Sequence, residues 1–124
     1  MRNWTTSELD TIDAAEELKI APLRPDGSPR PYTTIWVVRV GDDLYVRSWR
    51  GRDGAWFRAA LRRPEGCIRA AGIERDVTFA EADHADQDAI DRAYRGKYAR
   101  YASTYVDPMI SPGARAATLR LTPR

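Results

Sequence analysis

Three arginines and a serine gather around one turn of the sequence, between Leu44 and Pro64 (LYVRSWRGRDGAWFRAALRRP). The residues before the turn predict a strand, and the apolar spacing after it predicts a short amphipathic helix. The free N–H groups and the dipole of a helix N-terminus favour an anion, and guanidinium groups match phosphate oxygens in pairs. The segment therefore predicts a seat for a phosphate. Its candidate residues are Arg47, Ser48, Arg50 and Arg52, with Trp49 and Trp56 on either side of the turn.

The period of the strand limits how many of these side chains can meet one ligand. Arg47 shares a face with Tyr45 and Trp49, whereas Ser48 and Arg50 face the other side. All four polar residues converge only if the turn twists. The alternative to a binding site is a solvated set of strand-end charges, paired with Asp42, Asp43, Asp53 or Glu74.

No other segment carries a recognisable set of catalytic groups. His84 is the only histidine, so neither a catalytic triad nor a zinc site is expected, and no metal is predicted. Cys67 is the only cysteine and is expected to be a small buried residue on a strand. The helical spacing of Tyr94, Tyr98 and Tyr101 predicts a packing stripe, although a tyrosine in a pocket could also donate a proton. The catalytic residues stay unassigned.

Length and charge restrict the class of protein. A chain of 124 residues is expected to form one domain, spanning 1–124, and to bury roughly two-thirds of its unfolded surface. The net charge is only +2, because 18 acidic residues offset 20 basic ones, so a nucleic-acid partner is not expected. No secretory signal and no apolar run of about 18 residues is present. The sequence predicts a cytoplasmic protein without a membrane partner.

Apolar periodicity and turn residues predict the elements that position the arginine turn. A capping box of Thr5 and Glu8 predicts a helix from about Thr6 to Ala15. Further helices are predicted over Gly54 to Arg63, with Asp53 as N-cap, and from Asp83 or Asp86 to about Tyr101, followed by a loop. The predicted strands are Leu18 to about Leu23, Thr33 to Val40, Leu44 to Trp49, Cys67 to Ala71, Val77 to Glu81 and Thr118 to Thr122. The pattern favours an α+β fold, a small barrel or half-barrel of about six mainly antiparallel strands with short flanking helices.

Two segments carry a resemblance to a known superfamily: TTIWVVRVGDDLYVRSWRGRDGAWFRAALRRP (Thr33 to Pro64) and GCIRAAGIERDVTF (Gly66 to Phe79). They resemble the FMN-binding split β-barrels, which include pyridoxamine phosphate oxidases and deazaflavin-dependent nitroreductases. In the nitroreductase-like relatives a strand ends in a Gly-containing turn, and a Trp then opens a helix that finishes at a proline. Gly51, Trp56 and Pro64 match this order. Nearly the whole chain is also similar to a family of small uncharacterised bacterial proteins grouped with those barrels.

The resemblance implies a split β-barrel that forms a homodimer, with FMN or a deazaflavin in the interface groove. It implies that basic and hydroxyl side chains hold the cofactor phosphate and that a tryptophan flanks the ring. The residues so implicated are Arg30, Trp36, Arg47, Ser48, Trp49, Arg50 and Arg52. The implied function is a flavin- or deazaflavin-binding oxidoreductase of unknown substrate.

Two departures from the pattern keep an alternative function open. The lysine that contacts phosphate in the oxidases is absent, since the only lysines are Lys19 and Lys97. The turn also carries Asp53, whose carboxylate is expected to cap the helix and to repel a phosphate. The alternative is a non-catalytic dimeric barrel that holds a small anionic ligand and no cofactor.

Overall fold

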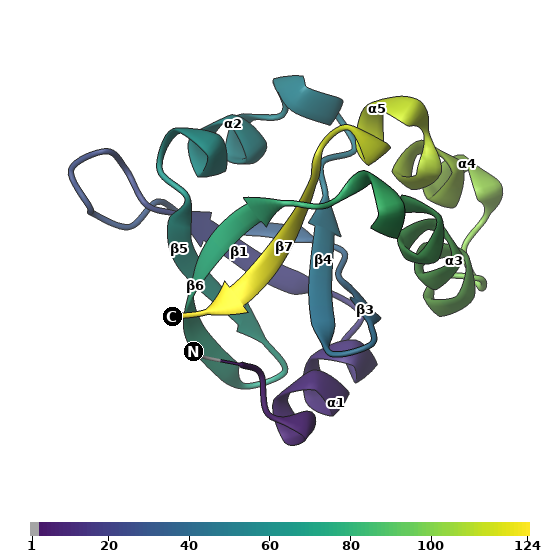
Figure 1. Cartoon of the computed structure of the whole chain (residues 1–124), viewed down its shortest axis with the longest axis horizontal. Coiled ribbons are helices and arrows are strands. Elements are labelled where there is room, and N and C mark those ends of the chain that lie inside the picture. The colour runs from purple at the N-terminus through teal and green to yellow at the C-terminus, as the bar shows by residue number, and fades with distance from the viewer. Residues whose placement is uncertain (1–2) are drawn as a thin grey trace.

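A curled antiparallel sheet of seven strands forms the centre of the molecule, and helices cover its ends (Figure 1). The structure is a computed structural model that describes residues 3–124. The strand order is β2-β1-β5-β6-β7-β4-β3, and every neighbouring pair is antiparallel. The strands are β1 (Leu18–Pro22), β2 (Thr33–Ile35), β3 (Val38–Val40), β4 (Asp43–Arg47), β5 (Glu65–Ala70), β6 (Ile73–Glu81) and β7 (Thr118–Pro123). The expected α+β split barrel is confirmed.

Short helices connect the strands. The first, α1 (Thr6–Ala14), has the expected capping box, in which Thr5 and Glu8 bond each other's backbone. The others are η1 (Gly51–Asp53), α2 (Ala55–Arg62), η2 (His84–Asp86), α3 (Gln87–Lys97), α4 (Ser103–Val106), η3 (Asp107–Ile110) and α5 (Pro112–Arg115). The prediction of a plain loop after α3 is wrong, because residues 103–115 form three short helical turns. In the described part of the chain, no helix is long and apolar enough to cross a membrane.

The predicted strand Thr33 to Val40 is divided at Trp36 and Val37, which gives one strand more than expected. A side chain from α3 explains the break. The hydroxyl of Tyr98 accepts a hydrogen bond from the N–H of Val37 (3.1 Å) and donates to the carbonyl of Glu16 (2.7 Å). The ammonium group of Lys97 donates to the carbonyl of Val37 (2.8 Å). Side chains therefore satisfy the backbone of Val37 where a sheet neighbour would otherwise do so.

The sheet has a core on each face. One core packs α1 and α2 against the inside of the barrel, around Leu18, Leu44 and Phe57. The other lies between β3, β4 and α3 and includes Tyr45, Tyr94 and Tyr98. The tyrosine stripe of α3 is thus a packing surface, as the spacing predicts, and burial raises the pKa of both Tyr94 and Tyr98.

Candidate functional site

Three cavities lie in series along β2, where the barrel opens between this strand and the end of β4. A cavity of about 430 Å³ and one of about 260 Å³ share Ile35 and Trp49 in their walls. The second shares Thr33, Ala55 and Trp56 with a third cavity of about 240 Å³. We call them the aromatic cavity, the anion seat and the arginine cavity. Their shared walls form one groove, and concave sites of this kind are where ligands usually bind.

The anion seat is lined by Ser48, Arg50 and the N-terminus of α2. The expected Asp53 cap is wrong: Gly54 is the N-cap of α2, and no side chain bonds the helix N-terminus. Asp53 lies instead in η1, before the cap. The first N–H groups of α2 are therefore left for a ligand, which is the usual arrangement around a bound phosphate.

Ser48 and Arg50 complete the donors of this seat. Ser48 is buried, and its hydroxyl forms no hydrogen bond with any residue that the structure describes, although it lines the cavity. A Cβ atom added to Gly54 would lie 2.2 Å from the Oγ of Ser48, so only glycine allows this approach. Arg50 is exposed, has no carboxylate partner among residues 3–124, and lies over Trp49 at 5.6 Å. The seat therefore offers a hydroxyl, a guanidinium and backbone N–H groups.

The aromatic cavity is the most apolar of the three and fits a flat ring. Trp36 and Trp49 line it, together with Thr104, Tyr105, Pro108 and Met109 from the α4–η3 segment. Trp36 stacks on Tyr98 with ring centres 3.9 Å apart and planes 5° apart, which fixes its orientation. Trp49 and Tyr105 are each 65% exposed, a large value for aromatic side chains. An aromatic ligand here would cover apolar surface that water now contacts.

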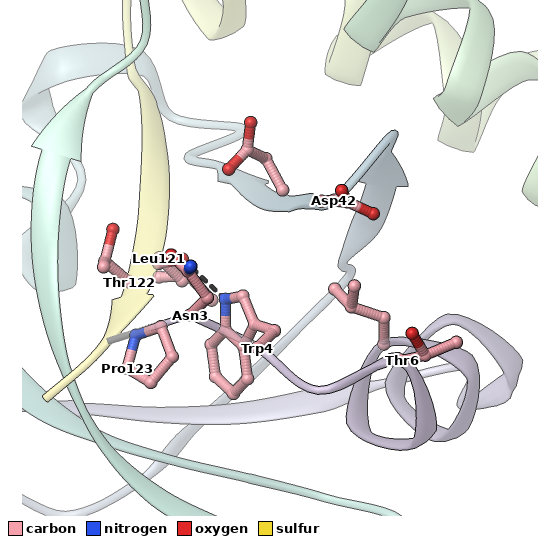
Figure 2. A pocket seen from close by; sticks show the side chains of 9 residues that line it. Asn3, Trp4, Thr6, Asp42, Leu121, Thr122 and Pro123 are labelled. Carbon is pink, nitrogen blue, oxygen red and sulfur yellow. Dashed lines mark hydrogen bonds between the residues drawn. The ribbon is translucent and has the colours of Figure 1, made fainter. Parts of the chain in front are cut away.

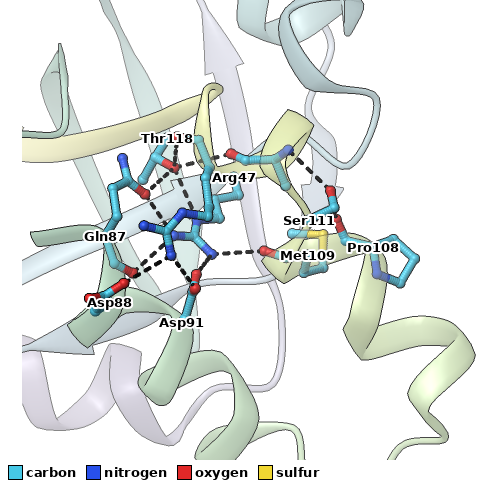
Figure 3. A network of polar contacts seen from close by, with 10 residues as sticks. Arg47, Gln87, Asp88, Asp91, Pro108, Met109, Ser111 and Thr118 are labelled. Atoms are coloured by element: carbon cyan, nitrogen blue, oxygen red, sulfur yellow. Dashed lines mark hydrogen bonds and ion pairs between the residues drawn. The ribbon is translucent and has the colours of Figure 1, made fainter. Parts of the chain in front are cut away.

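Arg47 lies at the end of the aromatic cavity but is committed to the protein itself (Figure 3). Its side chain is fully buried and donates five hydrogen bonds, as many as a guanidinium has N–H groups. The acceptors are the Thr118 hydroxyl (3.0 Å), the Asp91 carboxylate (2.5 Å), the Met109 carbonyl (2.9 Å), and the carbonyl and side-chain oxygens of Gln87 (3.4 and 2.7 Å). Arg47 holds α3 and η3 on the barrel and has no donor left for a phosphate.

The other two arginines implicated by the sequence point in different directions. Arg52 donates to the carboxylate of Glu81 (2.6 Å) and to the carbonyl of Ala116 (2.8 Å), which ties η1 to β6 and to the C-terminal end of α5. Arg30 lines the arginine cavity, beyond the anion seat. The alternation of side chains along the strand predicted that Arg47 and the pair of Ser48 and Arg50 would face opposite sides. In the structure Ser48 and Arg50 line the seat, whereas Arg47 turns toward α3.

A further cavity of about 330 Å³ lies at the opposite end of β4 (Figure 2). Trp4 lines it and donates from its indole N–H to the carbonyl of Leu121 (2.9 Å). Asp42 and Asp43 lie in the same wall. Two carboxylates disfavour a phosphate, so the groove along β2 remains the candidate site.

Several groove residues could not be identified from the sequence. Gly54 is predicted to be a helical residue after an Asp53 cap, and the segment that forms α4 and η3 is predicted to be a loop. Gly54 follows an aspartate that resembles a better N-cap, and the role of residues 104–109 depends on tertiary packing against β4. The only signal in the sequence that indicates Gly54 as a groove residue is its position close to the arginines of the predicted phosphate seat.

Neither a metal site nor a reactive thiol is found among the described residues. No group of three or more His, Cys, Asp or Glu side chains within residues 3–124 could hold a metal ion. Burial, together with a hydrogen bond to Asp76, raises the pKa of Cys67 to about 11. The thiol is therefore protonated at neutral pH and a poor nucleophile.

Known proteins resemble this chain in sequence and in fold. The model of a family described as uncharacterized protein conserved in bacteria (DUF2255) matches residues 8–121. No curated protein matches the chain. An F420-H2 dependent reductase (FDR-A) shares the fold with a TM-score of 0.63 at 12% identity, over 86% of this chain and 93% of that one.

Two other solved structures are similar. An FAD-binding protein from Mesorhizobium loti has a TM-score of 0.61 at 15% identity, over 98% of this chain and 90% of that one. HutZ, a heme storage protein from Vibrio cholerae, has a TM-score of 0.65 at 14% identity, over 100% of this chain and 92% of that one. At these identities the similarity establishes the split-barrel fold, which flavin-, F420- and heme-related proteins share.

Proposed function

This chain belongs to the DUF2255 family of bacterial proteins, and we propose that it is a flavin- or deazaflavin-binding oxidoreductase. One observation carries the proposal: an apolar cavity lined by aromatic side chains adjoins an anion seat, and the two share Ile35 and Trp49. FMN and deazaflavin cofactors combine a flat ring with a phosphate several bonds away. The order of the cavities matches that combination, and structural neighbours named for F420 and FAD support it.

Each part of the groove has a role in this proposal. The Ser48 hydroxyl, the Arg50 guanidinium and the N–H groups of α2 hold the phosphate, and Trp36 and Trp49 flank the ring. Arg47 and Arg52 position neighbouring elements and do not hold the phosphate. A flavin or deazaflavin ring would supply the hydride chemistry when bound. The chain would supply binding, orientation and exclusion of water, which explains why no acid–base pair is visible in the sequence.

We extend the proposal to a homodimer in the cytoplasm. Trp49 and Tyr105 are the most exposed aromatic side chains of the groove, and a second copy would cover them. Cys67 is a free thiol, as is usual in a reducing compartment. Sedimentation or light scattering should give twice the 14.0 kDa of the chain. A monomer at micromolar concentration, with and without cofactor, would remove the dimer from the proposal.

The cofactor is tested by titrating the purified protein with FMN, with F420 and with riboflavin. We expect the binding of FMN or F420 to quench either the tryptophan fluorescence of the protein or the fluorescence of the cofactor, and to saturate. The dissociation constant should be in the micromolar range, which is a binding free energy of about −8 kcal/mol. Riboflavin lacks the phosphate and should bind about tenfold more weakly than FMN. If neither FMN nor F420 binds, the oxidoreductase proposal fails.

The second candidate function is the non-catalytic barrel that binds a small anion. It is favoured by the single unpaired guanidinium at the seat, since Arg47 and Arg52 are engaged elsewhere. A rise in melting temperature with inorganic phosphate or pyrophosphate, without binding of any ring-bearing cofactor, would select it.

A further inference from the structure

We propose that the arginine cavity binds a second anionic group, joined to the cofactor beyond its phosphate, through Arg24 and Arg30. This inference rests on the proposed function and extends it to the class of cofactor. The group is a phosphate or a carboxylate. The cavity has a volume of about 240 Å³ and lies between the β1–β2 loop and α2. In Figure 1 this loop projects from the barrel on the side of α2.

The arginine cavity continues the groove directly beyond the anion seat. It shares Thr33, Ala55 and Trp56 with the anion seat, so a chain leaving the seat along β2 enters it directly. Arg24, Arg30 and Pro31 form its outer wall. A ligand that extended from the aromatic cavity through the seat would thus end between two guanidinium groups.

Three arginines that line the groove differ from many others in this protein in their lack of an ion-pair partner among the described residues. Many arginines in this protein have a carboxylate partner, including Arg52 with Glu81 and Arg63 with Glu65. Arg24, Arg30 and Arg50 have none within ion-pair distance in the described part of the chain. All three line the groove. Asp26 interacts with Arg24 only at a longer range than an ion pair, so within residues 3–124 the three guanidinium groups can still bind an anion.

The hydrogen bonds around Arg24 and Arg30 leave N–H donors of both guanidinium groups available to a ligand. Arg24 uses one nitrogen to donate to the carbonyl of Pro29 (2.6 Å), which fixes the loop and keeps the side chain beside it. The nearby carboxylate of Asp26 accepts from the backbone and hydroxyl of Ser28, and these bonds lower its pKa. The Nε of Arg30 is buried and has no hydrogen-bond partner. A buried donor without a partner is costly, and a movement of the Arg30 side chain toward an anion in the cavity would remove that cost.

The arrangement distinguishes between cofactors. FMN ends at its phosphate monoester and would fill the aromatic cavity and the seat only. FAD continues through a second phosphate, and F420 continues from a phosphodiester to carboxylates. The arginine cavity gives these longer cofactors an additional contact that FMN cannot make.

The test compares FMN, FAD and F420 on matched variants. In the double variant Arg24→Gln/Arg30→Gln, the ratio of the affinity for FAD or F420 to the affinity for FMN should fall about tenfold. The affinity for FMN itself should stay within about twofold of that of the parent protein. The control, Arg58→Gln/Arg62→Gln, removes the same charge from exposed residues of α2 that line none of the three cavities. Here the ratio should not change.

The outcomes separate this inference from the function on which it rests. FMN binding with a ratio that stays constant, or that falls equally in the control, would overturn the second anion site and leave the proposed function intact. A loss confined to FAD would identify the group as a phosphate, and a loss confined to F420 would identify it as a carboxylate. Binding of none of the three would overturn both.

Discussion

Replacing Arg47 with methionine is expected to lower the free energy of unfolding by about 3–5 kcal/mol. The substitution keeps most of the side-chain volume but removes five hydrogen bonds and the buried one of two arginine partners of Asp91, which retains only Arg115. The oxygens of Gln87 and Met109 would also lose a donor. Buried acceptors without a donor, and a buried carboxylate that has lost its buried partner, are strongly destabilising.

Urea or guanidinium unfolding measures this change directly. The double variant Arg47→Met/Asp91→Leu should recover part of the loss, because it also removes the carboxylate that has lost its buried partner, while Arg115 keeps its ion pair with Asp88. Arg52→Met is the matched control: its ion pair with Glu81 is exposed, so it should cost no more than about 1 kcal/mol. A cost for Arg47→Met as small as that of the control would mean that the buried network does not hold α3 on the barrel.

The second large effect concerns Gly54, where alanine should weaken FMN binding about tenfold without unfolding the protein. The backbone of Gly54 suits any residue (φ −60°), but the new Cβ would lie 2.2 Å from the Ser48 Oγ. The serine hydroxyl can rotate away, so the fold survives. The donor that lines the anion seat is then displaced, and a methyl group occupies part of the seat.

Riboflavin and a second glycine provide the controls. Because riboflavin has no phosphate, Gly54→Ala should change its affinity by less than about twofold. Gly96→Ala, in α3, meets nothing within 4 Å and should leave all affinities unchanged. If Gly54→Ala bound FMN as tightly as the parent protein, the phosphate would have to lie elsewhere.

Local patterns predicted much of the fold, because they depend on near neighbours. The Thr5 and Glu8 capping box, the β-branched strands and the proline after α2 each act within a few residues, and each predicted element is present. The exceptions depend on distant side chains. Tyr98 reaches across 61 positions to the N–H of Val37 and divides a strand whose own sequence favours continuity.

The sequence indicated the segment that lines the groove, but it could not separate the residues that line the groove from their neighbours. Alternation correctly placed Ser48 and Arg50 on one face and Arg47 on the other. It could not show that Gln87, Asp91, Met109 and Thr118 would together take every donor of Arg47, because these residues lie 40 to 71 positions away. Nor could it show that Gly54, not Asp53, begins α2 and leaves the helix N-terminus uncapped.

The central claim is that the groove along β2 holds a cofactor with its ring beside Trp36 and Trp49 and its phosphate at the N-terminus of α2. A crystal structure of the protein grown with whichever of FMN and F420 binds in solution tests it most directly. The account predicts the phosphate within hydrogen-bond distance of the Ser48 hydroxyl, the Arg50 guanidinium and an N–H group of α2. A phosphate at any other place, such as the cavity beside Asp42 and Asp43, would contradict it.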